Sequence, residues 1–255
     1  MAENTKILAV AGKGGVGKTS IAANMVRVLT ETCPGKKILA IDADPAVGLS
    51  TAVGIDVKTT IDDIRKSVGA AAEEGDTRSA LELLGEARYQ IFDALVEENG
   101  FSFIAVGRPE AAGCYCKINT YLKAVIQILS DQFDYVVIDG EAGIEQINRR
   151  VMEKVTHLFL ATDCSKKGTD VIKTIKHVAD DLVMADAVGV IANRLPSVDI
   201  TAVMDVGDLN IVSAIPSDPS LAEFDLKGEN VFFLPENASI VEGTRMALKN
   251  LGVID

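Results

Sequence analysis

Short apolar runs alternate along this chain with longer segments in which apolar residues recur at helical spacing. The runs predict β-strands at Ile7–Ala11, Ile38–Ile41, Phe101–Val106, Tyr135–Asp139, His157–Ala161, Ala187–Ala192 and Leu209–Ala214. The periodic segments predict helices over Ile21–Leu29, Tyr121–Leu129, Val171–Met184 and Ile240–Leu251. This alternation is typical of an α/β fold with a doubly wound, mostly parallel sheet flanked by helices. The small, acidic stretch Ala70–Thr77 predicts a surface loop.

Length and composition agree with a single domain over residues 1–255, because a chain with 48% apolar residues can form a large core. No apolar run approaches the ~18 residues of a membrane span, and the first residues do not resemble a signal peptide. We therefore expect a cytoplasmic protein without a membrane partner. Acidic residues outnumber basic ones by 37 to 25, and the net charge of −12 argues against nucleic acid as a partner.

The first apolar run leads into Gly-Lys-Gly-Gly-Val-Gly-Lys-Thr at residues 12–19. This segment matches the pattern G-x-x-x-x-G-K-[ST], in which glycines let successive backbone N–H groups face phosphates. Lys18 brings a positive charge to the β- and γ-phosphates of ATP, and the Thr19 hydroxyl is a Mg²⁺ ligand. The predicted ATP-binding residues of this segment are Gly12, Lys13, Gly14, Gly15, Val16, Gly17, Lys18, Thr19 and Ser20.

Carboxylates follow two other predicted strands. Asp42 and Asp44 lie at the end of the second strand, and Asp139 ends the strand that begins at Tyr135. Aspartates at strand ends are often only turn formers. Beside a phosphate loop, they favour a role in phosphoryl transfer, which depends on positioning and charge neutralisation. Asp139 has the form of a Walker B carboxylate, which holds Mg²⁺ directly or through water.

Lys13, a second lysine within the phosphate loop, resembles the signature of one ATPase family. This deviant Walker A motif occurs in septum-site, plasmid-partition, nitrogenase-iron-protein and metallochaperone ATPases. The resemblance implies an ATP-dependent homodimer in which Lys13 contacts the nucleotide bound by the partner subunit. It gives Asp44 the role of positioning the attacking water and Gly143 that of donating its N–H to the γ-phosphate. The predicted catalytic residues are Lys13, Lys18 and Asp44.

Two later strand ends add to the predicted ATP site. Asn193-Arg194 follows one strand, and Pro216-Ser217-Asp218 follows another. Taken alone, each pattern predicts only a turn that ends a strand. In the family that Lys13 resembles, the corresponding positions hold the adenine through the Asn side-chain amide and the backbone of the proline loop. The resemblance therefore adds Asn193, Arg194, Pro216 and Asp218 to the ATP-binding residues.

Cys114 and Cys116 lie in the sequence Gly-Cys-Tyr-Cys, within a loop that glycine and proline interrupt. Cysteine also packs as a small hydrophobe, but burial of two thiols has no evident packing reason in such a loop. One pair supplies two thiolates, whereas structural zinc and related sites usually need four. A twofold dimer brings the same loop from both subunits to one axis. We therefore expect an interfacial Ni²⁺ or Zn²⁺ held by four sulfurs, and the ligands alone do not choose between these metals.

Gly-Cys-Tyr-Cys, together with Asp-Gly-Glu-Ala-Gly at residues 139–143, resembles the CooC family of carbon monoxide dehydrogenase maturation ATPases. The resemblance implies that the protein helps nickel enter carbon monoxide dehydrogenase or the related acetyl-CoA synthase. It would do so by carrying the metal or by remodelling the client through ATP-driven closure.

Two other functional classes of ATPase stay open. A partition or cell-division switch needs a DNA- or membrane-binding surface, and an electron-donating iron protein needs a cluster cysteine near residues 141–145, where this chain has none.

Overall fold

One sheet organises the described part of the chain. The structure is a computed structural model that describes residues 5–44, 48–73, 80–107, 116–140, 151, 154–182 and 184–255, with the backbone alone for residues 68–73, 80–84 and 116–122. Eight strands within these residues form the sheet, in the order β3-β4-β2-β5-β1-β6-β7-β8. The strands are β1 (Lys6–Gly12), β2 (Ile38–Asp42), β3 (Val96–Glu98), β4 (Phe101–Ala105), β5 (Tyr135–Asp139), β6 (Val155–Thr162), β7 (Ala185–Leu195) and β8 (Ile211–Pro216). All paired strands run parallel except β3 and β4 at one edge, which confirms the predicted fold class.

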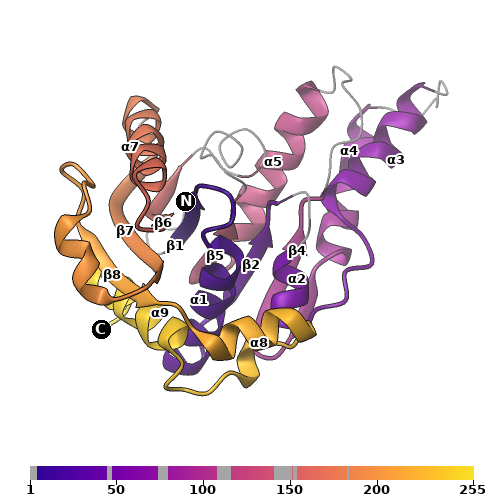
Figure 1. Ribbon diagram of the computed structural model, residues 1–255. Coiled ribbons are helices and arrows are strands. Elements are labelled where there is room, and N and C mark those ends of the chain that lie inside the picture. Colours follow the sequence, from indigo (N-terminus) through magenta and orange to yellow (C-terminus); the bar gives the residue numbers. More distant parts are fainter. Residues whose placement is uncertain are drawn as a thin grey trace.

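Helices cover both faces of this sheet (Figure 1). The apolar residues of α1 (Lys18–Thr32), α2 (Gly48–Val53), α8 (Pro219–Lys227) and α9 (Ser239–Asn250) pack on one face. Those of α3 (Ile61–Glu73), α4 (Ala80–Asp93), α5 (Cys116–Ser130) and α7 (Lys166–Asp181) pack on the other. The short 3₁₀ helix η1 (Val198–Val203) connects β7 to β8, and η2 (Val231–Phe233) connects α8 to α9.

The core has two halves because side chains alternate between the faces of a strand. On β1, Ile7 and Ala9 are buried with α3, α4, α5 and α7, whereas Leu8 and Val10 are buried with α1, α2, α8 and α9. Since both faces are covered, the strand is a continuous apolar run rather than an alternating one. Its burial fixes Gly12, and the loop that follows, at the middle of the sheet edge.

Each predicted strand corresponds to a strand of the sheet, although β8 lies slightly further along the chain than Leu209–Ala214. The three residues of β3 are too few and too polar to produce a strand signal. The loop predicted at Ala70–Thr77 is wrong at its start, because residues 70–73 form the last turn of α3. Alanine is the strongest helix former, so its small side chains there favour helix over loop. No helix among the described residues is long and apolar enough to cross a membrane.

Parallel register brings the strand ends to one edge of the sheet. Asp139 of β5 pairs with Asp42 of β2 on one side and with Val10 of β1 on the other. Gly12 of β1 pairs with Ala161 of β6. Ligands of doubly wound sheets bind at the carboxyl ends of the strands. The motifs predicted at separate strand ends therefore lie along one edge.

Two helical glycines provide a test of how tightly α9 packs in the core half that it shares with α1, α2 and α8. A Cβ at Gly243 of α9 would lie 2.4 Å from Ile215 Cγ1, whereas a Cβ at Gly85 of α4 would meet nothing within 4 Å. We expect Gly243→Ala to lower the free energy of unfolding by roughly 1–3 kcal/mol through overpacking. Gly85→Ala is the control and should raise it by up to about 1 kcal/mol, because alanine is the better helix former. Urea unfolding measures both, and a stabilising Gly243→Ala would contradict the packing of α9 on β8.

Candidate nucleotide-binding site

The loop between β1 and α1 has backbone geometry that only glycine adopts readily. Gly12 has a φ of 152°, and a Cβ there would lie 2.1 Å from the carbonyl oxygen of Ala161. Gly17, which precedes α1, is left-handed with a φ of 89°. Because glycine has no side chain, Gly17 provides no side-chain cap for the first N–H groups of α1. A helix start of this kind is suited to an anion, because its N–H groups and its dipole both favour negative charge.

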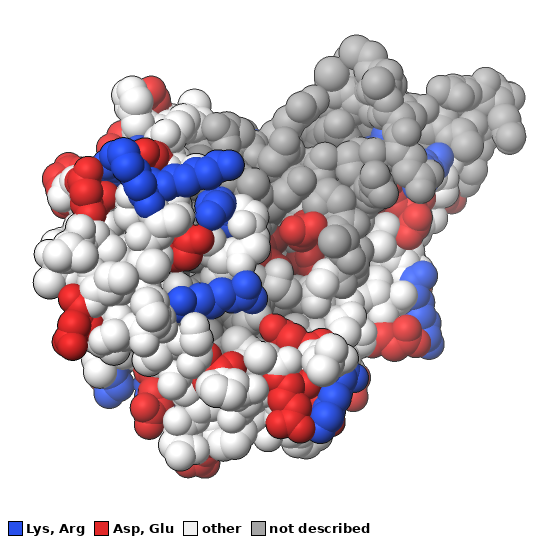
Figure 2. Space-filling model, viewed as in Figure 1, with Lys and Arg blue, Asp and Glu red and all other residues white. Residues whose placement is uncertain are grey.

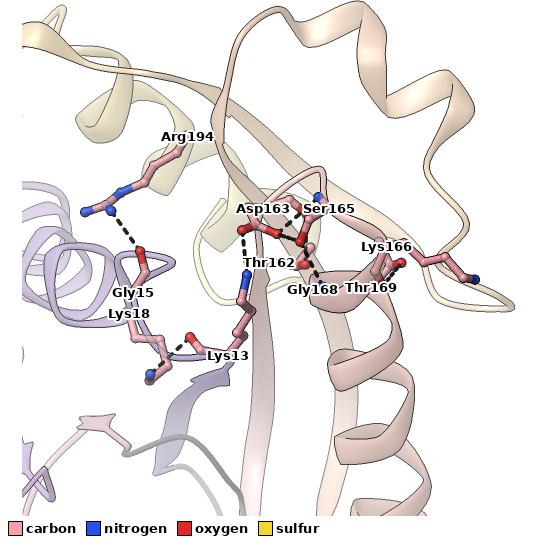
Figure 3. Close-up of polar contacts among 10 residues, drawn as sticks. All are labelled: Lys13, Gly15, Lys18, Thr162, Asp163, Ser165, Lys166, Gly168, Thr169 and Arg194. Carbon is pink, nitrogen blue, oxygen red and sulfur yellow. Dashed lines mark hydrogen bonds and ion pairs between the residues drawn. The ribbon is translucent and has the colours of Figure 1, made fainter.

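Two consecutive side chains near the end of β7 hold this loop, and Figure 3 shows the bond from Arg194. Asn193 Nδ2 donates to the carbonyl oxygen of Val16 at 2.8 Å, and Arg194 Nη1 donates to that of Gly15 at 2.8 Å. Because the N–H and C=O of one peptide point in opposite directions, bonding these carbonyls turns the following N–H groups to the other side. The structure therefore gives Asn193 and Arg194 a contact with the phosphate loop, and their contact with adenine stays a prediction.

The two lysines of the loop have different surroundings. Lys18, the first residue of α1, is only 8% exposed, and its Nζ donates to the carbonyl oxygen of Lys13 at 3.4 Å. Lys13 Nζ lies 3.0 Å from Asp163 Oδ2, in the loop that follows β6. Figure 3 shows the Lys13 side chain directed toward Asp163. Lys18 is therefore placed for phosphates in its own loop, whereas Lys13 is paired with a neighbouring loop.

Asp163 is a polar residue of this region that sequence reasoning missed. Its Oδ1 accepts a hydrogen bond from the backbone N–H of Ser165 at 3.1 Å and another from the Ser165 hydroxyl. Burial alone would raise the pKa of Asp163, but the hydrogen bonds from Ser165 and Lys13 outweigh it and lower that pKa. The available signal was the aspartate that directly follows an apolar strand, the same signal that identified Asp139.

Two buried carboxylates lie side by side where β2 and β5 end. Asp42 is 0% exposed and Asp139 is 1% exposed. Burial raises the pKa of Asp42 to about 6 and that of Asp139 to about 7. The N–H groups of Asp44 and Leu49 donate to the two oxygens of Asp42 at 3.1 and 2.9 Å. Neither oxygen of Asp139 accepts a hydrogen bond of good geometry from the described residues, although the Thr19 hydroxyl lies close enough to act on its pKa.

This edge fits a magnesium ion. A buried carboxylate without hydrogen bonds is costly unless a cation or a proton neutralises it. The Thr19 hydroxyl and the Lys18 charge both act to lower the pKa of Asp139, against its burial and the nearby charge of Asp42. Hydroxyl and carboxylate oxygens are ligands that Mg²⁺ prefers. The predicted ligands Thr19 and Asp139 therefore lie next to one another and beside the phosphate loop.

Asp44, the predicted water-positioning residue, is half-buried just beyond the end of β2. Its backbone N–H bonds to Asp42, which ties its position to the buried carboxylate pair. Gly48, the first residue of α2, lies close to Thr19, since a Cβ at Gly48 would be 3.6 Å from Thr19 Cγ2. The structure thus brings Asp44 to the same edge as Thr19 and Asp139. Gly143, the other residue predicted at the γ-phosphate, lies outside the described residues.

Asp218 has a structural role that the sequence did not indicate. Its Oδ1 accepts hydrogen bonds from the N–H groups of Ser220 and Leu221 at the start of α8, at 2.9 and 3.2 Å. Its Oδ2 accepts one from the N–H of Ile240 at the start of α9, at 3.0 Å. Pro216 ends β8 two residues earlier. Both oxygens of Asp218 thus hold two helices beside the proline loop, and its contact with ATP stays a prediction.

The predicted metal site lies largely beyond the described residues. Cys114 is outside them, and of Cys116 only the backbone at the start of α5 is described. Elsewhere in the described part of the chain, no three His, Cys, Asp or Glu side chains gather as metal ligands would. On the face shown in Figure 2, acidic and basic side chains of the described residues are interspersed.

Comparisons with known proteins identify relatives that bind nucleotides. A sequence model of the CobQ/CobB/MinD/ParA nucleotide binding domain matches residues 7–231. An uncharacterized ATP-binding protein of Methanocaldococcus jannaschii is 36% identical over 92% of this chain and 93% of its own length. The carbon monoxide dehydrogenase accessory protein CooC of Rhodospirillum rubrum is 29% identical over 89% of each chain. The structure of the septum site-determining protein MinD from Pyrococcus horikoshii, complexed with Mg-ADP, superposes with a TM-score of 0.70 at 23% identity, covering 96% of this chain and 95% of that one.

The raised pKa of Asp139 predicts a pH dependence of stability without metal. The folded-state pKa of about 7 lies above the ordinary aspartate value of 3.8, so the folded state binds this proton more tightly. Stability from this group is therefore present at low pH and lost as the pH rises toward 7. Asp139→Asn should exceed the parent in free energy of unfolding at pH 8 by up to about 4 kcal/mol, and the difference should shrink toward pH 4.

Urea unfolding in the presence of a chelator measures this difference. Asp134→Asn is the matched control at the opposite end of β5, because hydrogen bonds from Lys37 and Lys36 lower the pKa of Asp134. Asp134→Asn should therefore lose rather than gain stability at pH 8. If Asp139→Asn and the parent differ by the same amount at every pH, Asp139 does not titrate as its burial requires.

Proposed function

Because the chain belongs to the CobQ/CobB/MinD/ParA family of nucleotide-binding domains, we propose that it is a Mg²⁺-dependent ATPase that acts as a homodimer in the cytoplasm. The observation that carries this proposal is the prepared phosphate loop. Its Gly15 and Val16 carbonyls are bonded to β7 side chains, and the helix that follows has no side-chain cap. The Asp139 carboxylate lies beside Thr19 and has no well-formed hydrogen bond from the described residues, which supports Mg²⁺ binding there.

Each residue has a defined role in this reaction. The phosphates of ATP bind the N–H groups at the start of α1, and Lys18 neutralises charge on the β- and γ-phosphates. Thr19 and Asp139 hold Mg²⁺, which withdraws charge from the same oxygens. Asp44 orients the attacking water, and Gly143 donates its N–H to the γ-phosphate. Hydrolysis then yields ADP and phosphate.

The dimer follows from Lys13. Lys13 contacts the nucleotide of the partner subunit, so ATP binding draws the two subunits together.

The adenine contacts come from the ends of β7 and β8. After its bond to Val16, the Asn193 amide has a second N–H for adenine, and its oxygen has no hydrogen-bond partner among the described residues. Asp218 contributes through its backbone, because both of its carboxylate oxygens already accept hydrogen bonds from α8 and α9.

The same protein serves as a maturation factor that helps nickel enter carbon monoxide dehydrogenase or acetyl-CoA synthase. In the proposed dimer, Cys114 and Cys116 of both subunits hold Ni²⁺ or Zn²⁺ between them. ATP-driven closure brings the pairs together, and hydrolysis releases the metal or the remodelled client. Support comes from the cysteine motif and from the similarity to the CooC accessory protein.

A positioning switch of the MinD or ParA type is the second candidate. The specific observation in its favour is the superposition on MinD over nearly the whole chain. Both candidates share ATP-dependent dimerisation, and they differ in what the dimer binds. A switch needs a membrane or DNA surface, whereas a maturation factor needs the thiolate site. The cysteine experiment below therefore separates them.

Substitutions at two loops test the ATPase assignment. Lys18→Ala should abolish ATP binding by removing a buried charge from the phosphates. Asp44→Asn should leave ATP binding unchanged and slow hydrolysis by roughly 10²-fold or more, because it alters water positioning alone. Phosphate release and calorimetric titration measure the two effects. Lys36→Ala, a change at an exposed lysine paired with Asp134, is the control. Hydrolysis at the parental rate by Asp44→Asn would remove Asp44 from the reaction.

Equilibrium dialysis with Ni²⁺ and Zn²⁺ tests the interfacial metal. We expect one ion per two chains, with more dimer when metal is added, because each chain offers two thiolates. Cys114→Ser and Cys116→Ser should each abolish metal binding and nickel-dependent activation of the client, yet leave ATP hydrolysis intact. Cys164→Ser, at a half-buried free cysteine, is the matched control. One ion per monomer, unaffected by these changes, would rule out the four-sulfur site.

A further inference from the structure

Lys13 is held by a carboxylate of its own chain. Its Nζ lies 3.0 Å from Asp163 Oδ2, and the two side chains are 28% and 30% exposed. No other carboxylate among the described residues lies within ion-pair distance of this ammonium. This ion pair connects the phosphate loop, which follows β1, to the loop between β6 and α7 (Figure 3).

The β6–α7 loop is shaped to present Asp163 in this way. Ser165 donates its N–H and its hydroxyl to Asp163 Oδ1, and its Oγ in turn accepts the N–H of Gly168 at 3.0 Å as the cap of α7. A Cβ at Gly168 would lie 2.3 Å from Asp163 Oδ1, so this position leaves no room for a side chain. Ser165 thus occupies one carboxylate oxygen, and the other is directed to Lys13.

Neighbouring lysines do not share this carboxylate. Lys166 directs its side chain away from Asp163 (Figure 3), and its Nζ lies 3.8 Å from Asp170 of α7. Lys173 also pairs with Asp170, at 3.3 Å. Asp163 and Asp170 are therefore two carboxylates near the start of one helix, and Lys13 pairs with the first.

We propose that Asp163 holds the Lys13 ammonium in the monomer and competes for it with the partner subunit's nucleotide. The inference rests on the proposed contact of Lys13 across the dimer. A carboxylate and a phosphate are both anionic oxygen acceptors, and the bond to Asp163 directs Lys13 toward its own chain. Dimerisation breaks this contact once in each subunit. Asp163 therefore weakens the ATP-bound dimer and limits dimer formation at low protein concentration.

Asp163→Asn tests this competition. The amide oxygen of asparagine still accepts the hydrogen bonds from Ser165, so the cap of α7 is kept while the charge that holds Lys13 is lost. Half-exposed ion pairs are weak, and two are broken per dimer, so we expect dimerisation at roughly three- to tenfold lower protein concentration. Sedimentation with a slowly hydrolysed ATP analogue measures it. Asp170→Asn, which removes the same charge from α7, should leave dimerisation unchanged.

Lys13→Ala separates failure of this inference from failure of the proposed function. If Lys13→Ala leaves dimerisation unchanged, Lys13 makes no contact across the dimer, and both ideas fall. If Lys13→Ala weakens dimerisation while Asp163→Asn matches the parent or weakens it too, only the holding role is overturned. The double variant should dimerise as Lys13→Ala does, because Asp163 acts through Lys13. Additive effects in the double variant would also contradict the inference.

Discussion

Backbone N–H groups can face an anion only if the carbonyls of the same peptides are satisfied on the opposite side. The phosphate loop meets this constraint through Asn193 and Arg194. These two residues lie near the end of β7, at the edge of the sheet, and their side chains donate to the Val16 and Gly15 carbonyls. Glycine at positions 12 and 17 supplies the close approach to β6 and the left-handed turn. Contacts with the sheet therefore hold the shape of this loop.

Charge at this edge is arranged in two different ways. Asp139 is buried and has no well-formed hydrogen bond from the described residues, so burial raises its pKa to about 7, and a nearby cation would favour its ionised form. Asp163 is half-exposed and bonded to Ser165 and Lys13, so its pKa falls. The first arrangement suits the Mg²⁺ proposed there, and the second holds the Lys13 ammonium. Both arise because parallel strands deliver their terminal residues to one place.

Most of the fold followed from local pattern, because strands buried on both faces are apolar runs that need no tertiary information. The phosphate loop could also be predicted from the sequence, because its glycines and Lys18 lie within one short motif. Contacts between residues far apart in the sequence could not be predicted. The bond from Asn193 to Val16 and the capping of two helices by Asp218 depend on strand order and loop geometry, which periodicity does not encode. Residues 70–73 form helix rather than the predicted loop, because alanine is small but is also the strongest helix former.

The central claim is that a loop held by β7 side chains recognises phosphate at the edge of the sheet. Calorimetric titration of the parent protein with adenosine, ADP and ATP, each with and without Mg²⁺, tests it most directly. The account predicts one nucleotide per chain, with affinity that rises from adenosine to ADP and ATP and depends on Mg²⁺. Equal affinity for adenosine and ATP, or binding that ignores Mg²⁺, would contradict it.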